Sequence, residues 1–340
     1  MEDRSGMSNF PFEVKELEPE EKATLAKLYK SPNMDYVSVG PKKYKVMRRF
    51  LEDAANIYNM PLRHSDIFVL TYQRSGTTWT QELVWLLANN LDYAGAAKEL
   101  LTQRYSFLEM FMFFNKNWEK NFLEGISQPL TIKSLATPVS ETLLSSPSPR
   151  FIKSHLPMSL LPPQLLGTTK VVYVARDPRD VAVSSYHHSR LFKMYGYAGT
   201  FAEFWDLFLK DIFTLTPYFE HIKEAWDLRN HPNMLFLFYE SLLKDLPAAV
   251  RRVADFLGKQ LTAEQMSRLC DHLSFENFKK NDSVNYEELR DIGLLASEET
   301  FIRTGRAGGW RAYFDDEMTQ QAERWIADNL RDTDLRFPDV

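Results

Sequence analysis

The chain has 340 residues, of which 44% are apolar and 14% aromatic, which is enough to bury a large core. It carries 41 Lys and Arg against 46 Asp and Glu, a balance that argues against both a disordered chain and a general nucleic-acid binder. The single cysteine, Cys270, cannot form an intramolecular disulfide. The N-terminus lacks the pattern of a signal peptide and no apolar run is long enough to cross a membrane, so we expect a cytoplasmic protein.

Apolar runs typical of buried strands alternate with helical patterns along the chain. Strands that are apolar on both faces and alternate with helices indicate a parallel sheet covered by helices. No linker divides the sequence, so we expect one P-loop-like α/β domain over residues 1–340, with a central, mostly parallel sheet and helices on both faces. We predict strands over 67–72, 151–153, 170–175 and 234–239, and helices over 77–90, from 178 onward, and over 247–257.

Three further helices are predicted from side-chain spacing. Thr262 and Gln265 form a capping box that opens a helix towards His272. An apolar stripe over 318–330 predicts a helix near the C-terminus. A third stripe is aromatic, with spacings of four, three, four and four residues, and consists of Phe107, Phe111, Phe114, Trp118 and Phe122.

The segment TYQRSGTTW, residues 71–79, joins the first strand to the first helix. Backbone N–H groups at a helix start lack internal partners and, with the helix dipole, form an anion site. Arg74 adds a charge, and Gly76 allows the backbone to approach the anion closely. Hydroxyl donors are also present, on Ser75, Thr77 and Thr78. An ordinary capped turn explains this pattern equally well, and the loop is no Walker A motif because no lysine follows the glycine.

A second signal follows the strand over 170–175. Arg176 stands at the carboxyl end of this strand, where ligands bind in open α/β sheets. Ser184 lies about two helical turns further on, and a guanidinium with a hydroxyl suits a second phosphate. Taken alone, Arg176 is better explained by a surface salt bridge with Asp177 or Asp180.

A third signal is FIRTGRAGGW, residues 301–310, which carries Arg303, Arg306 and three glycines. A flexible basic loop of this kind can close over a phosphate, because its glycines permit close backbone contact. The alternative is a plain surface loop before the last helix.

Together the three segments resemble the cytosolic sulfotransferase family. The matching stretches are TYQRSGTTW, VVYVARDPRDVAVSSYHH and FIRTGRAGGW, in the family's order, with KSHLP, LFLFYE and Ser274-Phe275 also matching. The resemblance covers about residues 66–313. It implies a P-loop-like α/β fold that uses the sulfuryl donor 3′-phosphoadenosine 5′-phosphosulfate (PAPS) without a metal.

The resemblance also implies roles for individual residues. His155 would be the general base that takes the acceptor's proton, as a histidine near neutrality can, with Lys153 and Arg74 as further catalytic groups. Many family members have lysine where this chain has Arg74, and arginine keeps the charge but is not expected to donate a proton. The implied cofactor contacts are Arg74, Ser75, Gly76, Thr77, Thr78, Trp79, Arg176, Ser184, Tyr239, Ser274, Phe275, Arg303, Thr304 and Gly305. Of these, Arg176 and Ser184 would hold the 3′-phosphate, and Trp79 and Phe275 would enclose the adenine.

The expected acceptor is a small lipophilic phenol, steroid or retinoid-like alcohol. Four aromatic residues of the stripe are candidate walls of its pocket, although each fits core packing as well: Phe107, Phe111, Phe114 and Trp118. Residues 281–302 are a second candidate wall. The long segment between Trp79 and Lys153 resembles insect members of the family, including a retinol dehydratase, so sulfonation followed by elimination stays open.

Two other functions stay open from the sequence. Glu240, after the strand over 234–239, leaves a P-loop nucleotide kinase possible, because such enzymes place an acidic magnesium ligand at a strand end. A non-catalytic nucleotide or lipid binder is the third reading. The residues after Trp310, RAYFDDEMTQ, lack the family's dimerisation pattern, which leaves a dimer undecided.

Overall fold

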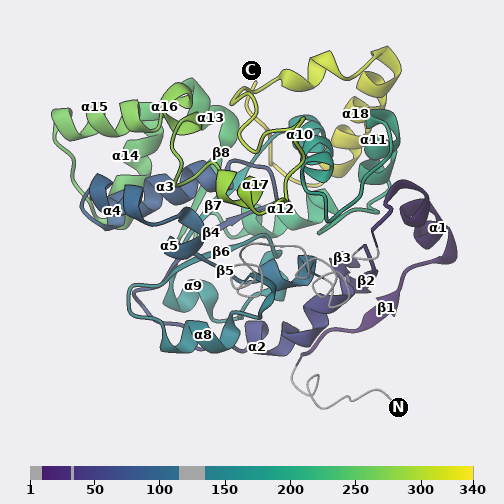
Figure 1. Cartoon of the computed structure of the whole chain (residues 1–340), viewed down its shortest axis with the longest axis horizontal. Coiled ribbons are helices and arrows are strands. Elements are labelled where there is room, and N and C mark those ends of the chain that lie inside the picture. The colour runs from purple at the N-terminus through teal and green to yellow at the C-terminus, as the bar shows by residue number, and fades with distance from the viewer. Residues whose placement is uncertain (1–9, 32–33, 115–134, 340) are drawn as a thin grey trace.

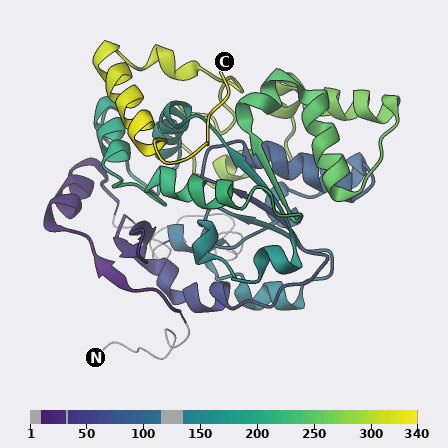
Figure 2. The ribbon, with the colours of Figure 1, turned by 180° about the vertical axis from the view of Figure 1, so that it is seen from behind.

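The computed structural model describes residues 10–31, 34–114 and 135–339. Its centre is a five-stranded sheet in the order β5-β6-β4-β7-β8, and every pair of neighbouring strands is parallel. Helices lie on both sides of this sheet (Figures 1 and 2). The predicted α/β class is therefore confirmed.

The four predicted strands of the sheet form as expected. They are β4 (Ile67–Thr71), β6 (Phe151–Ser154), β7 (Lys170–Ala175) and β8 (Met234–Phe238). Val171, Val172 and Val174 are fully buried, which is why the strand pattern is continuous rather than alternating. The fifth strand, β5 (Ser106–Phe107), pairs with β6 at the edge and was not predicted.

Two hydrophobic clusters lie on the two faces of the sheet. One cluster joins Val69 and Val172 to Leu83 of α3 (Thr77–Ala88) and Val253 of α14 (Leu246–Leu257). The other packs residues such as Tyr173 against α10 (Pro178–Leu191), α11 (Phe201–Leu209) and α12 (Tyr218–Asp227). The crossover helices thus cover both faces of the parallel sheet, as parallel sheets require.

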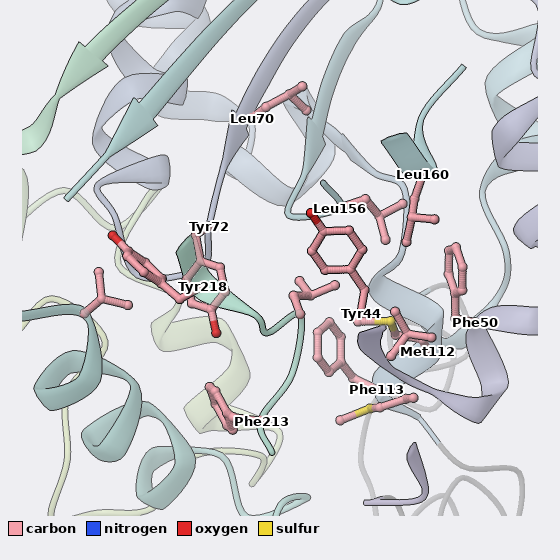
Figure 3. Packing of buried hydrophobic residues seen from close by; sticks show 14 of the residues in the cluster. Tyr44, Phe50, Leu70, Tyr72, Met112, Phe113, Leu156, Leu160, Phe213 and Tyr218 are labelled. Atoms are coloured by element: carbon pink, nitrogen blue, oxygen red, sulfur yellow. The ribbon is translucent and has the colours of Figure 1, made fainter. Parts of the chain in front are cut away.

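The second cluster supports the end of β4. Figure 3 shows Tyr72, which follows β4, beside Tyr218 of α12. Their ring centroids are 4.9 Å apart, and the Tyr72 hydroxyl donates to the Thr214 carbonyl over 2.9 Å. The Tyr218 hydroxyl donates to the carbonyl of Arg176. These buried tyrosines therefore hold in place the backbone next to two residues of the predicted site.

The aromatic stripe is not the predicted helix. Phe107 lies in β5, and Met110–Phe113 form a short 3-10 turn, η2. The pairing of Ser106 and Phe107 with β6 uses backbone groups that a helix would need, so tertiary pairing overrides the side-chain period. Trp118 and Phe122 lie outside the described residues.

A small antiparallel sheet, in the order β1-β2-β3, lies apart from the central one and was not predicted. No helix in the described part of the chain has the length and apolar character to cross a membrane. The remaining elements have the following bounds: β1 Val14–Glu16, α1 Pro19–Leu28, β2 Tyr36–Val39, β3 Tyr44–Met47, η1 Arg48–Glu52, α2 Ala54–Tyr58, α4 Tyr93–Lys98, α5 Leu101–Arg104, α8 Ser140–Ser145, η3 Met158–Leu160, α9 Leu165–Thr168, α13 Tyr239–Lys244, α15 Ala263–His272, α16 Phe275–Lys279, α17 Glu287–Asp291, η4 Gly309–Ala312 and α18 Asp316–Asn329.

A buried ion pair joins the starts of β4 and β6, and its loss provides a test of the fold. The Arg150 Nε donates to Asp66 Oδ1 over 2.8 Å, and both residues are buried. Asp66→Ala leaves the guanidinium buried without its partner, so we expect a loss of about 3–5 kcal/mol in unfolding free energy. Asp35→Ala, which breaks an exposed pair with Arg48, should cost less than about 1 kcal/mol. Equal midpoints of urea unfolding for the two variants would contradict this account.

Candidate functional site

A cavity of about 490 Å³ opens at the carboxyl ends of β4, β6, β7 and β8. Its lining brings together segments that are far apart in the sequence: residues 73–74 and 76–79, Lys153, His155, Arg176, Tyr239, 273–275 and 301–305. The three motif segments predicted to share a ligand therefore do lie around one cavity. Ser75 and Ser184 are buried beside it and are not among the lining residues.

The turn after β4 has a left-handed backbone at two positions. Arg74 has φ 67° and Gly76 has φ 97°, and Gly76 is the N-cap of α3. A Cβ on Gly76 would lie 2.6 Å from the Tyr239 ring, so only glycine fits this position without strain. The turn presents the start of α3 to the cavity, where free N–H groups and the helix dipole favour an anion.

Four cationic side chains line the cavity: Arg74, Lys153, Arg176 and Arg303. No aspartate or glutamate is among the described residues that line it. Burial, and then the charges of Arg176 and Arg303, lower the pKa of Arg74 to about 10. The described residues at the cavity therefore carry uncompensated positive charge, which suits a polyanion.

Arg176 does not form the salt bridge with Asp177 or Asp180 that was the alternative to a phosphate contact. Its guanidinium donates to the carbonyls of Arg74 and Arg306, each over 3.0 Å. Asp177 pairs with Arg179 instead, and Asp180 accepts from the backbone N–H of Gly308 and Trp310. The nearby carboxylates are thus used elsewhere, and the charge of Arg176 stays available to a ligand.

His155 follows β6 and is held as a specific tautomer. Its Nδ1 lies 3.0 Å from the carbonyl oxygen of Thr71, which can only accept, so Nδ1 carries the ring proton. Burial, and then the charge of Lys153, holds the pKa of His155 well below its usual value of 6.5. The ring is therefore neutral near pH 7, with a lone pair on Nε2, which is the form a general base needs.

Glu109 is a residue of the site that the sequence reasoning missed. Its carboxylate is buried and accepts from the His155 backbone N–H over 2.5 Å and from the Ser154 hydroxyl over 2.8 Å. Burial raises the pKa of Glu109 to about 7. A signal was present, because a glutamate inside the apolar run FLEMF needs a buried partner.

Lys153 lies against the aromatic edge of the cavity. Its Nζ is 4.2 Å from the centroid of the Phe107 ring. Burial lowers the pKa of Lys153 to about 8; the charge of Glu109 opposes this shift, and the charge of Arg74 adds to it. Lys153 therefore stays protonated at neutral pH but loses its proton more easily than an exposed lysine does.

Two aromatic side chains, Trp79 of α3 and Phe275, line the cavity close to residues 273–305. The indole N–H of Trp79 donates to the Leu273 carbonyl over 2.9 Å. A Cβ on Gly305 would lie 2.1 Å from the Phe275 ring, so glycine is required there. The two aromatic rings, which both line the cavity, suit a flat, aromatic base.

The remaining wall is largely apolar and aromatic. Phe107 lines it as the sequence predicts, whereas Phe111 and Phe114 are buried in the core and are not lining residues. Trp118 lies outside the described residues. Tyr286 and Phe301, from the second candidate wall over 281–302, line it as well. Other wall residues, which the sequence did not single out, are Met110, Phe113, His188, Phe192 and Tyr195.

Orphaned polar atoms indicate how the charged end would be filled. The Ser75 hydroxyl and the Arg176 Nε are buried, and neither has a hydrogen-bond partner among the described residues. An anion with several acceptor oxygens would satisfy both. No cluster of His, Cys, Asp and Glu in the described residues could hold a metal ion. The residues present therefore fit a phosphate-bearing nucleotide.

Comparison with known proteins gives a consistent picture. A sulfotransferase domain model matches residues 64–334. The luciferin sulfotransferase of Photinus pyralis is 34% identical over 87% of this chain and 80% of its own length, and sulfotransferase 1B1 of Canis lupus familiaris is 30% identical over 86% and 93%.

Solved structures of retinol dehydratase are also similar. One, in complex with androsterone and the inactive cofactor PAP, is 51% identical, covers 98% of this chain and all of the other, and has a TM-score of 0.91. A second, in complex with retinol and PAP, is 52% identical with the same TM-score and covers 97% and 100%.

The protonation state of His155 can be measured directly. With selectively ¹⁵N-labelled histidine, we expect NMR to show His155 titrating below 6.5, because burial and the neighbouring ammonium disfavour its charged form. Lys153→Met removes that ammonium and should raise the pKa of His155, whereas Lys15→Met, at an exposed lysine, should leave it unchanged. A wild-type value at or above 6.5 would contradict the assignment.

Proposed function

Because the chain belongs to the sulfotransferase family, we propose that it transfers a sulfuryl group from PAPS to the hydroxyl of a small lipophilic acceptor. The observation that carries this proposal is a single cavity whose described lining combines four cations, no carboxylate and a largely apolar, aromatic wall. His155 lines the same cavity. Its ring centroid lies 5.3 Å from that of Phe107.

The donor would bind through charge and close backbone contact. We assign its 5′-phosphosulfate to the turn over 74–78, and its 3′-phosphate to Arg176 and Ser184 with Arg303, Thr304 and Gly305. Trp79 and Phe275 would enclose the adenine, with Tyr239 and Ser274 at its side. As the sulfuryl group leaves the donor phosphate, negative charge grows on the phosphate oxygen, and fixed N–H groups and guanidinium groups stabilise it there.

The acceptor would be activated by His155. The Nε2 lone pair takes the proton of the acceptor hydroxyl while the acceptor oxygen forms its bond to sulfur and the sulfur–oxygen bond to the donor phosphate breaks. Glu109 fixes the backbone of His155, and the Thr71 carbonyl fixes the ring tautomer. Lys153 adds positive charge close to the reacting oxygens.

A second candidate is sulfonation of an allylic alcohol followed by elimination. It is favoured by the 51–52% identity to retinol dehydratase over nearly the whole chain. The first step is the same in both cases, so the donor site does not distinguish them. The aromatic wall would determine which acceptor binds: a phenol, a steroid or a retinoid-like alcohol.

Two further readings are weaker. Glu240, which left a kinase open, accepts from the Asp177 N–H over 2.8 Å and is buried, so its carboxylate holds backbone rather than facing a magnesium site. A non-catalytic binder would have no use for a neutral, tautomer-fixed histidine in the cavity. The cytoplasmic location remains an expectation from the sequence, and whether the protein forms a dimer remains undecided.

His155→Ala separates catalysis from binding. We expect product formation from PAPS to fall by about 10²–10⁴-fold, the usual contribution of a general base, while the Kd for PAP measured by calorimetry stays within twofold. His64→Ala, at an exposed histidine, is the control and should change neither. An equal loss of turnover and PAP affinity would make His155 a structural residue.

A further inference from the structure

A second histidine, His187, joins three segments beside the cavity and has no role in the proposed chemistry. It lies on α10, three residues after Ser184. Its ring contacts Glu299, in the segment that leads into the 301–305 loop, and Tyr313, which follows η4. Its partners are 112 and 126 residues away in the sequence, so these contacts exist only in the folded chain.

The hydrogen bonds through this ring run in one direction. His187 Nδ1 lies 3.0 and 2.9 Å from the two carboxylate oxygens of Glu299, which accept, so Nδ1 carries the proton. Burial lowers the pKa of His187, which favours the neutral ring, and Nε2 then accepts from the Tyr313 hydroxyl over 2.7 Å. The Tyr313 oxygen in turn accepts from Arg303 over 3.5 Å.

Arg303 is the far end of this chain of contacts. Its guanidinium carbon lies 5.8 Å from the centroid of the Tyr313 ring, so the same tyrosine supports it by its hydroxyl and by its face. Arg303 also lines the cavity. A cavity cation is thus connected, through Tyr313, to a histidine that does not itself line the cavity.

Independent contacts anchor the loop on both sides of Arg303. On one side, the Glu299 carbonyl accepts from Arg290 over 2.9 Å. On the other, Asp180 of α10 accepts from the N–H groups of Gly308 and Trp310 over 2.6 and 2.9 Å. Arg303 lies between these anchors. His187 of α10 contacts Tyr313, which in turn contacts the Arg303 side chain.

We propose that His187 is a positioning residue that, through Tyr313, holds Arg303 in the orientation needed to bind the 3′-phosphate of the donor. The inference rests on the proposed donor site, and it assigns to His187 and Tyr313 discrimination between nucleotides with and without a 3′-phosphate. A hydrogen bond that only stabilised the fold would affect both nucleotides alike.

The test compares PAP with adenosine 5′-phosphate by calorimetry. Tyr313→Phe keeps the ring but removes the hydroxyl, so we expect the Kd for PAP to rise about three- to tenfold, as for loss of a typical hydrogen bond, and the Kd for adenosine 5′-phosphate to stay within twofold. His187→Ala should act in the same way. His187→Gln, whose amide can donate to Glu299 and accept from Tyr313, should recover most of the loss. In turnover, the KM for PAPS should rise while kcat stays unchanged.

Two variants calibrate the result. Arg176→Ala, in the proposed 3′-phosphate site, should show the same selectivity with a larger effect. Tyr186→Phe removes a neighbouring tyrosine hydroxyl that accepts from the exposed Arg190, and should change neither Kd. Two results would overturn the role of His187 and leave the donor site standing. One is an equal loss of affinity for PAP and adenosine 5′-phosphate, and the other is an unchanged Kd for PAP in Tyr313→Phe and His187→Ala. A wild-type protein with no preference for PAP would overturn the donor site and the inference together.

Discussion

The site depends on keeping four positive charges close together without neutralising them. Arg74, Lys153, Arg176 and Arg303 line one cavity whose described lining contains no carboxylate. The cost appears in the pKa values, because burial and mutual repulsion lower that of Arg74 to about 10 and that of Lys153 to about 8. Such an arrangement is expected where the binding of a polyanionic ligand offsets the free-energy cost of burying the cations together.

The fold meets this constraint by a division of hydrogen-bonding partners. Guanidinium groups bind backbone carbonyls, as Arg176 does with Arg74 and Arg306. Three carboxylates near the site bind backbone N–H groups instead: Glu109 holds His155, Asp180 holds Gly308 and Trp310, and Glu240 holds Asp177. Each charged group is therefore positioned, yet the cations keep their charge for a ligand. These bonds occupy Glu240, which the sequence left open as a magnesium ligand, and Asp180, which it left open as a salt-bridge partner of Arg176.

Much of this could be predicted from the sequence, because buried parallel strands leave an unbroken apolar pattern and the anion-binding turn has a compact local signature. Every strand of the sheet except the two-residue β5 was predicted. The aromatic stripe was not a helix, since Phe107 pairs with Lys153 of β6, a strand that comes much later in the sequence. Glu109 and His187 escaped because their partners are distant in sequence. The apolar run around Glu109 indicates that it needs a buried partner but not that this partner is the backbone of His155, and no local pattern links Glu299 to a helix.

The central claim is that this cavity moves a sulfuryl group from PAPS to a lipophilic hydroxyl without a metal. The most direct measurement incubates the protein with ³⁵S-labelled PAPS and a panel of phenols, steroids and retinoids in the presence of EDTA, and identifies the products by mass. The account predicts label in a sulfate ester or, with an allylic alcohol, a dehydrated product together with labelled inorganic sulfate. Intact PAP binding without label transfer to any acceptor, or magnesium-dependent consumption of ATP, would contradict it.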